Sequence, residues 1–274
     1  MLKKMIQNVK KTVPLIHNIT NNVTINDVAN ILLAAGGSPI MATDENEVED
    51  LTAICTGLSI NMGGLGLTPI ESIIKAGKKS NELNHPVTLD PVAAGATKYR
   101  TDIINDLISE IKFTAIRGNI SEFMALAAGG SSARGVDANE LDVVTDENLQ
   151  SVITLAKEYS KKTGAVIAIS GAIDIICDDK KAYVARNGNP IMTKVTGSGC
   201  MLSALTAAYV SANPSSALDA AAAASIIMGI AGELGYEKMI ETNSGISSFR
   251  NFMIDAIYNL DEDTLERRAK YEIY

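Results

Sequence analysis

Five short apolar segments, rich in β-branched residues, recur along the chain and are separated by longer stretches with helical spacing. They are Ser38–Ala42, Leu58–Gly63, Val87–Pro91, Phe113–Asn119 and Ala165–Gly171. Short runs of this kind are typical of parallel strands buried on both faces, and the longer stretches suit the crossover helices between such strands. With 274 residues, 46% of them apolar, the chain can bury a full core. The sequence therefore predicts a single α/β domain over residues 1–274 with a mostly parallel central sheet.

One of the expected helices follows Asn22. Apolar residues at helical spacing run from Ile25 to Leu33, and Gly36–Gly37 ends the pattern. One asparagine of the preceding polar stretch is expected to be its N-cap. His17, in the same stretch, is interpreted either as a group of the site or as a buried structural histidine.

Charge and composition exclude several classes of function. The net charge is −8 and no basic block occurs, which argues against a nucleic-acid partner. The longest apolar run, 220–234, includes Ser225 and Glu233, so it predicts a buried helix and not a membrane span. Three widely spaced cysteines and the absence of a secretory leader indicate the reducing cytoplasm. The Gly- and Ser-rich stretch 129–135 and the acidic run to Glu147 are expected to form a surface loop.

A glycine turn directly before a helical pattern predicts an anion site. In Thr193–Cys200 the glycines are Gly197 and Gly199, and helix formers continue from Met201. Backbone N–H groups at a helix N-terminus favour phosphate. The alternative is a glycine pair that only lets a helix pack closely on a sheet. The pattern matches neither a P-loop nor a Rossmann fingerprint.

Polar side chains follow three of the expected strands, at the edge where open α/β sheets bind ligands. They are Asp90, Arg117 with Glu122, and Ser170. An arginine suits a nucleotide phosphate, and Mg²⁺ prefers one or two carboxylates with several waters. Each also has a purely structural interpretation. These are an Asp-Pro turn, a capping box from Asn119 to Glu122, and a Ser-Gly turn.

Two sulfur side chains complete the candidates. Cys200 opens the helix behind the glycine turn, where the helix N-terminus is expected to lower its pKa and give a thiolate near neutral pH. The alternative is a small buried apolar residue, which is how Cys55 and Cys177 are interpreted. Met41, at the end of an expected strand, is either core or a soft surface for a flat heteroaromatic ligand.

Five stretches in this order resemble the hydroxyethylthiazole kinases of thiamine salvage, within the ribokinase-like small-molecule kinases. The stretches are His17–Asn21, Ala35–Ala42, Leu89–Ala96, Arg117–Glu122 and Lys194–Cys200. The wider superfamily usually ends the glycine motif in aspartate, whereas cysteine there is characteristic of the thiazole kinases. The similarity extends from about Pro14 to Phe249.

The resemblance implies a three-layer α-β-α sandwich without a separate lid. It implies transfer of phosphate from ATP, with Mg²⁺, to the primary hydroxyl of 4-methyl-5-(2-hydroxyethyl)thiazole. It also implies a homotrimer with the sites at the subunit interface. By the same resemblance, Asn21, Met41 and Gly197 contact the thiazole, and Arg117 and Ser170 contact ATP. Asp90 and Glu122 arrange the magnesium ion. The amides of Gly197, Ser198 and Gly199 hold the migrating phosphoryl group, and Cys200 faces the acceptor hydroxyl.

The chain departs from the family pattern at Ser170, at Asn61–Gly64 and at Ser244–Phe249, and the last two concern the shape of the pocket. Rivals on the same fold are a hydroxymethylpyrimidine-type kinase and an ATP-dependent NAD(P)H-hydrate dehydratase. Both are expected to have aspartate in place of Cys200. A non-catalytic relative that binds thiazole or nucleotide is the alternative from another class.

Overall fold

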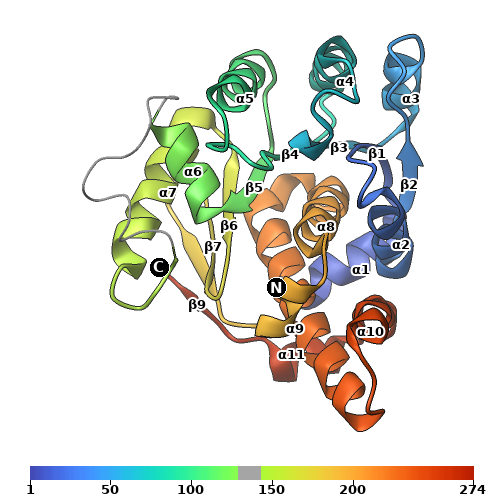
Figure 1. Ribbon diagram of the computed structural model, residues 1–274, viewed down its shortest axis with the longest axis vertical. Coiled ribbons are helices and arrows are strands. Elements are labelled where there is room, and N and C mark those ends of the chain that lie inside the picture. Colours follow the sequence, from blue (N-terminus) through green and yellow to red (C-terminus); the bar gives the residue numbers. More distant parts are fainter. Residues whose placement is uncertain (129–142) are drawn as a thin grey trace.

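One sheet runs through the computed structural model, which describes residues 1–128 and 143–274, in the order β2-β1-β3-β4-β5-β6-β7-β8-β9 (Figure 1). All pairs from β2 to β6 are parallel, and the pairs β6–β7, β7–β8 and β8–β9 are antiparallel. The sheet is therefore mostly parallel, as expected. The strands are β1 Leu15–Ile19, β2 Ser38–Met41, β3 Gly57–Asn61, β4 Val87–Asp90, β5 Ala115–Asn119, β6 Val166–Ser170, β7 Asp174–Cys177, β8 Ala182–Ala185 and β9 Tyr271–Ile273.

Helices cover both faces of this sheet, which confirms the three layers (Figure 1). One apolar cluster joins the sheet to α1, α2, α8, α9, α10 and α11, and a second joins the other face to α3, α4, α5, α6 and α7. The helices are α1 Leu2–Thr12, α2 Ile25–Ala35, α3 Val48–Ile54, α4 Ile70–Glu82, α5 Lys98–Glu110, α6 Ile120–Ala127, α7 Leu149–Thr163, α8 Ser198–Ala212, α9 Ala217–Glu241, α10 Ile246–Asn259 and α11 Glu262–Arg268. That residues 1–274 form one domain stays a prediction. It is supported by the single sheet, which contains both the first strand, β1, and the last strand, β9.

All five expected strands are present, each one to two residues shorter than its apolar run. The sequence pattern missed β1, because His17 and Asn18 interrupt its apolar residues, and it also missed the antiparallel strands β7, β8 and β9. His17 is fully buried, with Nδ1 2.8 Å from Thr52 Oγ1 and Nε2 3.0 Å from the Ala42 carbonyl. Burial lowers its pKa. Of the two interpretations of His17, the structure therefore supports the buried structural histidine.

The start of α2 differs from the expectation. The helix begins at Ile25 with Thr24 at the N-cap, so an asparagine N-cap was wrong. Asn21 instead accepts hydrogen bonds on Oδ1 from the N–H groups of Val23 at 3.0 Å and Thr24 at 3.1 Å, which stabilises the turn before the helix. The helix ends where expected, at Gly36 in the left-handed conformation (φ 91°).

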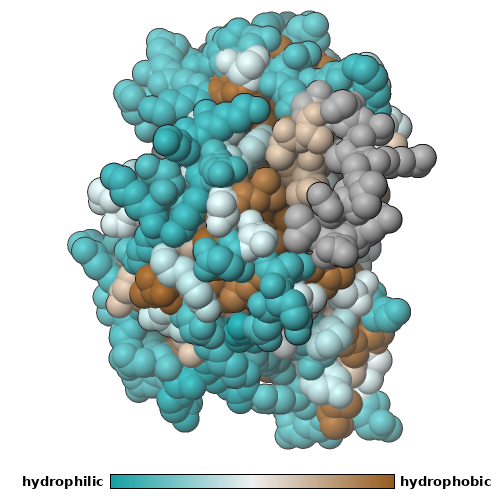
Figure 2. Space-filling view, turned by 90° about the vertical axis from the view of Figure 1, so that its left-hand side faces the viewer, coloured by the Kyte–Doolittle hydropathy of each residue, from teal (hydrophilic) through white to brown (hydrophobic). Residues whose placement is uncertain are grey.

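The apolar run 220–234 lies within α9, which is a core helix. The segment Pro214–Glu241 is the one helix of the described residues long and apolar enough to cross a membrane, but 72% of its most apolar window is buried inside the protein. The view in Figure 2 shows a mainly hydrophilic surface with smaller apolar patches. The expected loop at 129–135 lies outside the described residues.

Candidate functional site

Polar residues that end the strands, the predicted Asp90 and Ser170 among them, meet at one edge of the sheet. Asn61 ends β3 beside Asp90, which ends β4, and Asn119 ends β5 beside Ser170, which ends β6. Asn21 follows β1 by two residues. Strand order reverses between β1 and β3, and ligands in open α/β sheets bind at such a switch point, outside the carboxyl ends of the strands.

The glycine turn lies at this edge and starts α8. Gly197 is the N-cap in the left-handed conformation (φ 85°), and the first helical bond runs from Met201 N to the Gly197 carbonyl at 2.9 Å. The amides of Ser198, Gly199 and Cys200 therefore belong to the first turn, which lacks intrahelical acceptors. This geometry suits an anion, and anion binding stays a prediction.

The two glycines also allow neighbouring side chains to pack closely against the start of α8, as the structural alternative for this glycine pair predicted. A Cβ at Gly197 would lie 2.5 Å from Thr24 Cγ2. A Cβ at Gly199 would lie 2.7 Å from Arg117 Nη1. The second contact concerns function, because it brings the guanidinium of Arg117 against the turn that presents the free amides.

Arg117 joins the turn to the strand ends. Its guanidinium donates to Ser170 Oγ through Nη2, and Nη1 lies 3.7 Å from Asp90 Oδ2. Only 11% of its side chain is exposed. The structure thus brings together Arg117, Ser170, Asp90 and the glycine turn, as the sequence predicted.

Cys200 lies at the expected place, but the expected low pKa was wrong. Burial and the neighbouring Asp90 carboxylate raise the pKa of this thiol. Asn61 Nδ2, 3.2 Å from Sγ, and Asn21 Nδ2, 3.5 Å away, act in the opposite direction by donating to the sulfur. Loss of water around the thiolate and the nearby negative charge outweigh these hydrogen bonds and the one from Thr24, so the pKa lies above the usual value of a thiol and the group is protonated at neutral pH.

Glu122 forms the predicted capping box and a second contact that the sequence did not predict. Its Oε2 accepts the N–H of Asn119 at 2.8 Å, and the Asn119 side chain accepts the N–H of Glu122. Its Oε1 accepts the N–H of Ala93 at 2.9 Å, which fixes the turn after Asp90. Both oxygens thus have structural partners, and a magnesium role for Glu122 remains a proposal.

Asp90 fits a cation site. The side chain is 1% exposed, and burial raises its pKa to about 6, against the charge of Arg117 and the hydrogen bond from Ser203. Its Oδ1 has no partner among the described residues. A buried carboxylate oxygen without a donor is the kind of ligand that a divalent ion or its water shell completes.

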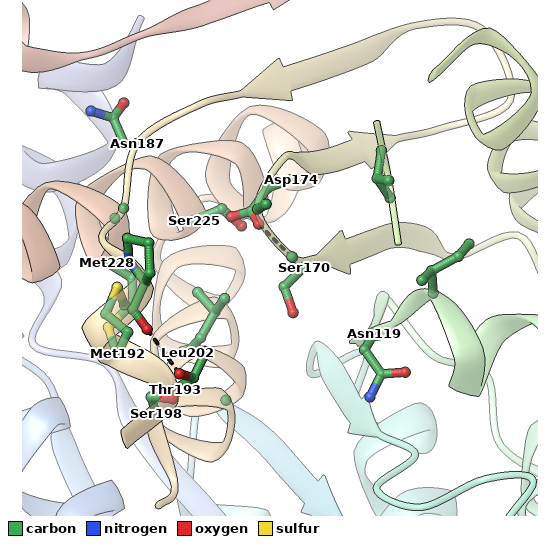
Figure 3. Close-up of a pocket in the computed structure, with 18 of the residues that line it drawn as sticks. Asn119, Ser170, Asp174, Asn187, Met192, Thr193, Ser198, Leu202, Ser225 and Met228 are labelled. Carbon is green, nitrogen blue, oxygen red and sulfur yellow. Dashed lines mark hydrogen bonds between the residues drawn. The ribbon is translucent and has the colours of Figure 1, made fainter. Parts of the chain in front are cut away.

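A cavity of about 540 Å³ adjoins these residues (Figure 3). Ser170 and Asn119 lie on one side of it, and Met192, Thr193 and Ser198 lie on the other. Leu202 and Met228 give the wall apolar surface. The volume and the mixed lining suit a nucleotide-sized ligand with its charged end at Arg117 and Gly199.

Three polar residues of the site were not predicted. Asp174 starts β7 and lines the cavity, where burial raises its pKa to about 7. Asn61 and Ser203 both contact Asp90. Asn61 had a signal, since it ends an expected strand in the same way as Asp90. Ser203 had none, because it is one small residue within a helical run.

Met41, like Asn21, Gly197 and Cys200, is a predicted site residue that does not line the described cavity. It ends β2 at the edge of the sheet, is half-buried, and packs against the cluster that includes α2 and α8. Among the described residues that line the cavity, Met41 does not occur. Its thiazole contact stays a prediction.

Comparison with known proteins agrees with this geometry. The model of the hydroxyethylthiazole kinase family matches residues 6–263. A protein named hydroxyethylthiazole kinase from Clostridium acetobutylicum is 58% identical over 274 residues, which is 100% of both chains. One from Clostridium tetani is 48% identical and covers 95% of this chain and 93% of its own.

Solved structures give the same result. The structure of a hydroxyethylthiazole kinase protein from Pyrococcus horikoshii has a TM-score of 0.87 at 32% identity, over 100% of this chain and 98% of that one. A pyridoxal kinase from Staphylococcus aureus has a TM-score of 0.57 at 19% identity, over 80% of this chain and 87% of that one, which shows a shared fold alone. With a matching family model over most of its length and a relative at 58% identity, the chain belongs to the hydroxyethylthiazole kinase family.

Proposed function

We propose that this protein transfers the γ-phosphoryl group of ATP to the primary hydroxyl of 4-methyl-5-(2-hydroxyethyl)thiazole in thiamine salvage. The observation that carries the proposal is the meeting of Arg117, Asp90 and the free amides of the glycine turn at the mouth of a nucleotide-sized cavity. The family match selects the acceptor. Cys200 stands where the two rival enzymes of this fold are expected to have aspartate.

Most of the catalysis comes from positioning and charge neutralisation. Arg117, held by Ser170, offers its guanidinium to the phosphates on the nucleotide side. The amides of Ser198 and Gly199 donate to the equatorial oxygens of the migrating group as they gain charge. Gly197, whose own amide precedes the helix, sets the path of the chain into that turn.

The acceptor hydroxyl faces Cys200 in this proposal. A loose transition state demands little negative charge on the attacking oxygen until late, so the hydroxyl keeps its proton until the new O–P bond is largely formed. The protonated Cys200 thiol orients the hydroxyl, and the proton then passes to an oxygen of the transferred phosphoryl group or to solvent. Mg²⁺, when bound, would neutralise charge on the phosphates, with Asp90 Oδ1 as its free carboxylate oxygen and Glu122 within reach of its water shell.

The test is ADP release with a panel of hydroxyethyl- and hydroxymethyl-heterocycles, ATP and Mg²⁺, followed by the mass of the product. The thiazole alcohol is expected to give its monophosphate with the highest kcat/KM. Turnover of a hydroxymethylpyrimidine with none of the thiazole would overturn the acceptor. Tight binding of both ligands without ADP release would favour the non-catalytic alternative.

We also propose a homotrimer in the cytoplasm, with Met41 supplied across the interface. Strand β2 is an edge of the sheet, and nearby Val23 and Leu33 are 74% and 56% exposed. A second subunit would cover this surface and exclude water from the transfer. Asn21 belongs to the site of its own chain in this arrangement, because its Nδ2 lies 3.5 Å from the Sγ of Cys200 in the same chain.

Subunit complementation tests the shared site. Met41→Arg chains and Cys200→Ala chains, each inactive alone, are expected to regain part of the activity after subunit exchange, because some interfaces then combine two intact halves. A fully active monomer at assay concentration, or inactive mixed oligomers of verified composition, would contradict the proposal.

A further inference from the structure

The side-chain amide of Asn61 has one possible orientation. Its Oδ1 accepts the backbone N–H of Gly63 at 2.9 Å and Nδ2 of Asn21 at 3.1 Å. Since a backbone N–H can only donate, the oxygen and not the nitrogen must face it. The residue is 4% exposed, so water does not compete for these contacts. Nδ2 therefore points the other way, into the site.

This nitrogen contacts two groups of the site at once. It donates to Asp90 Oδ2 at 2.9 Å and to Cys200 Sγ at 3.2 Å. An amide nitrogen has two hydrogens, one for each acceptor. A single amide thus links the carboxylate and the thiol.

Ser203 holds the same carboxylate oxygen from the helix. Its Oγ donates to Asp90 Oδ2 at 2.7 Å, and it lies on α8 three residues after Cys200, on the same face of the helix. Cys200, Asn61, Asp90 and Ser203 therefore form a closed ring that α8 completes. All fixed contacts of the carboxylate are on Oδ2, and Oδ1 is left without a partner among the described residues.

We propose that Asn61 and Ser203 are positioning residues, which fix the rotation of the Asp90 carboxylate so that Oδ1 faces the phosphates, and that Asn61 ties this orientation to the place of Cys200. This inference rests on the proposed function for what the oriented oxygen serves. Neither residue lines the nucleotide cavity in the described part of the chain. Their loss therefore affects the transfer step and not the binding of ATP.

The kinetic test uses Ser203→Ala, Asn61→Ala and the double variant. Each single change is expected to lower kcat about 10- to 100-fold, the range for small displacements of reacting groups, with KM for ATP within about threefold of wild type. The double variant is expected to be at most about threefold worse than the worse single one, because one freed carboxylate is already misplaced. If Asn61→Ala is not recovered folded, Asn61→Ser, which also lacks the amide nitrogen, takes its place.

Thr206→Val is the matched control. Thr206 has a fully buried hydroxyl one turn further along α8, and among the residues that the structure describes it donates to the Leu202 carbonyl alone, at 2.9 Å. Its loss is expected to leave kcat unchanged. Multiplying effects in the double variant, a raised KM for ATP at unchanged kcat, or an equal loss in Thr206→Val would each overturn the proposal.

A second readout needs no turnover. Without ligands, Ser203→Ala is expected to change the rate at which iodoacetamide alkylates Cys200 by at least about threefold in the wild-type background. The change is expected to be clearly smaller in the Asn61→Ala background, where no amide links Asp90 to the thiol. What remains there comes from the charge of Asp90 and from the Gly199 carbonyl, 3.3 Å from Ser203 Oγ. The same change in both backgrounds would refute the link. If the wild-type protein phosphorylates no alcohol of the panel, the proposed function fails, and this readout alone decides the positioning role.

Discussion

Adding one methyl group at Gly197 is expected to destabilise the protein for two separable reasons. The backbone there is left-handed (φ 85°, ψ 1°), which costs a residue with a Cβ about 1–2 kcal/mol. The new Cβ would also lie 2.5 Å from Cγ2 of the buried Thr24, and overpacking costs about 1–3 kcal/mol. Gly197→Ala is therefore expected to lower the free energy of unfolding by about 2–5 kcal/mol.

Two further variants separate these causes in urea unfolding followed by circular dichroism. Gly164→Ala is the control for the backbone, because Gly164 has nearly the same conformation (φ 72°, ψ 4°) with no atom within 4 Å of a Cβ, and it should cost only about 1–2 kcal/mol. Thr24→Ser removes the overlapping Cγ2 methyl and keeps the hydroxyl. In the Gly197→Ala background it should recover most of the overlap cost.

Equal losses in Gly197→Ala and Gly164→Ala would refute the overlap. A Gly197→Ala variant as stable as wild type would refute the left-handed turn itself. Failure of Thr24→Ser to recover stability, with the single Thr24→Ser variant unchanged, would show that the methyl is not the group in the way. Each outcome is read from the unfolding midpoint at constant m-value.

Three other predictions concern titration and hydrogen bonding. Because burial and Asp90 raise the Cys200 pKa, the rate of alkylation by iodoacetamide should still increase with pH above 9, the usual pKa of a thiol, and a plateau near pH 7 would contradict this. Glu122→Gln should cost about 1–3 kcal/mol of stability, because both carboxylate oxygens accept backbone N–H groups and the amide can keep only one; an unchanged unfolding midpoint would argue against the contact to Ala93 N. The pKa of Asp174 rises from 3.8 to about 7 in the folded protein, so the wild type loses stability as pH increases from about 4 to 7. Asp174→Asn should therefore be more stable than wild type at pH 8 and equal to it near pH 4, and a pH-independent difference would refute the shift.

The sequence predicted five of the six parallel strands, β2 to β6, because buried parallel strands leave a clear apolar signal. The three layers were implied by the family resemblance. Several of the predicted polar residues lie together at the carboxyl ends of these strands, and their roles stay predictions. The sequence pattern missed β1, whose His17 and Asn18 are polar yet buried, since Thr52 and the Ala42 carbonyl, distant in sequence, satisfy the imidazole. The pKa of Cys200 was wrong for a similar reason. Helix position is visible in the sequence, whereas burial and the distance to Asp90 depend on the tertiary fold.

The orientation of the Asn61 amide could not be predicted from the sequence, because it depends on the geometry of the fold. Its orientation follows from the Gly63 N–H, and its acceptors come from two other elements. Ser203 is a comparable case, because only the packing of α8 on the sheet turns one hydroxyl of the helix toward Asp90.

The strand order has a consequence for how the molecule folds. Apart from the exchange of β1 and β2, the strands from β1 to β8 pair with neighbours along the chain, at separations of up to about 50 residues, whereas β9 pairs with β8 from about 90 residues away. The site contacts are longer in range. Ser203 and Asp90 are 113 residues apart, Cys200 and Asn61 are 139 apart, and Cys200 and Asn21 are 179 apart. All three contacts form only when α8 packs against strands that lie about half the chain earlier in the sequence. Closing such long loops slows folding. On refolding, β-sheet circular dichroism should therefore return before the capacity to bind nucleotide.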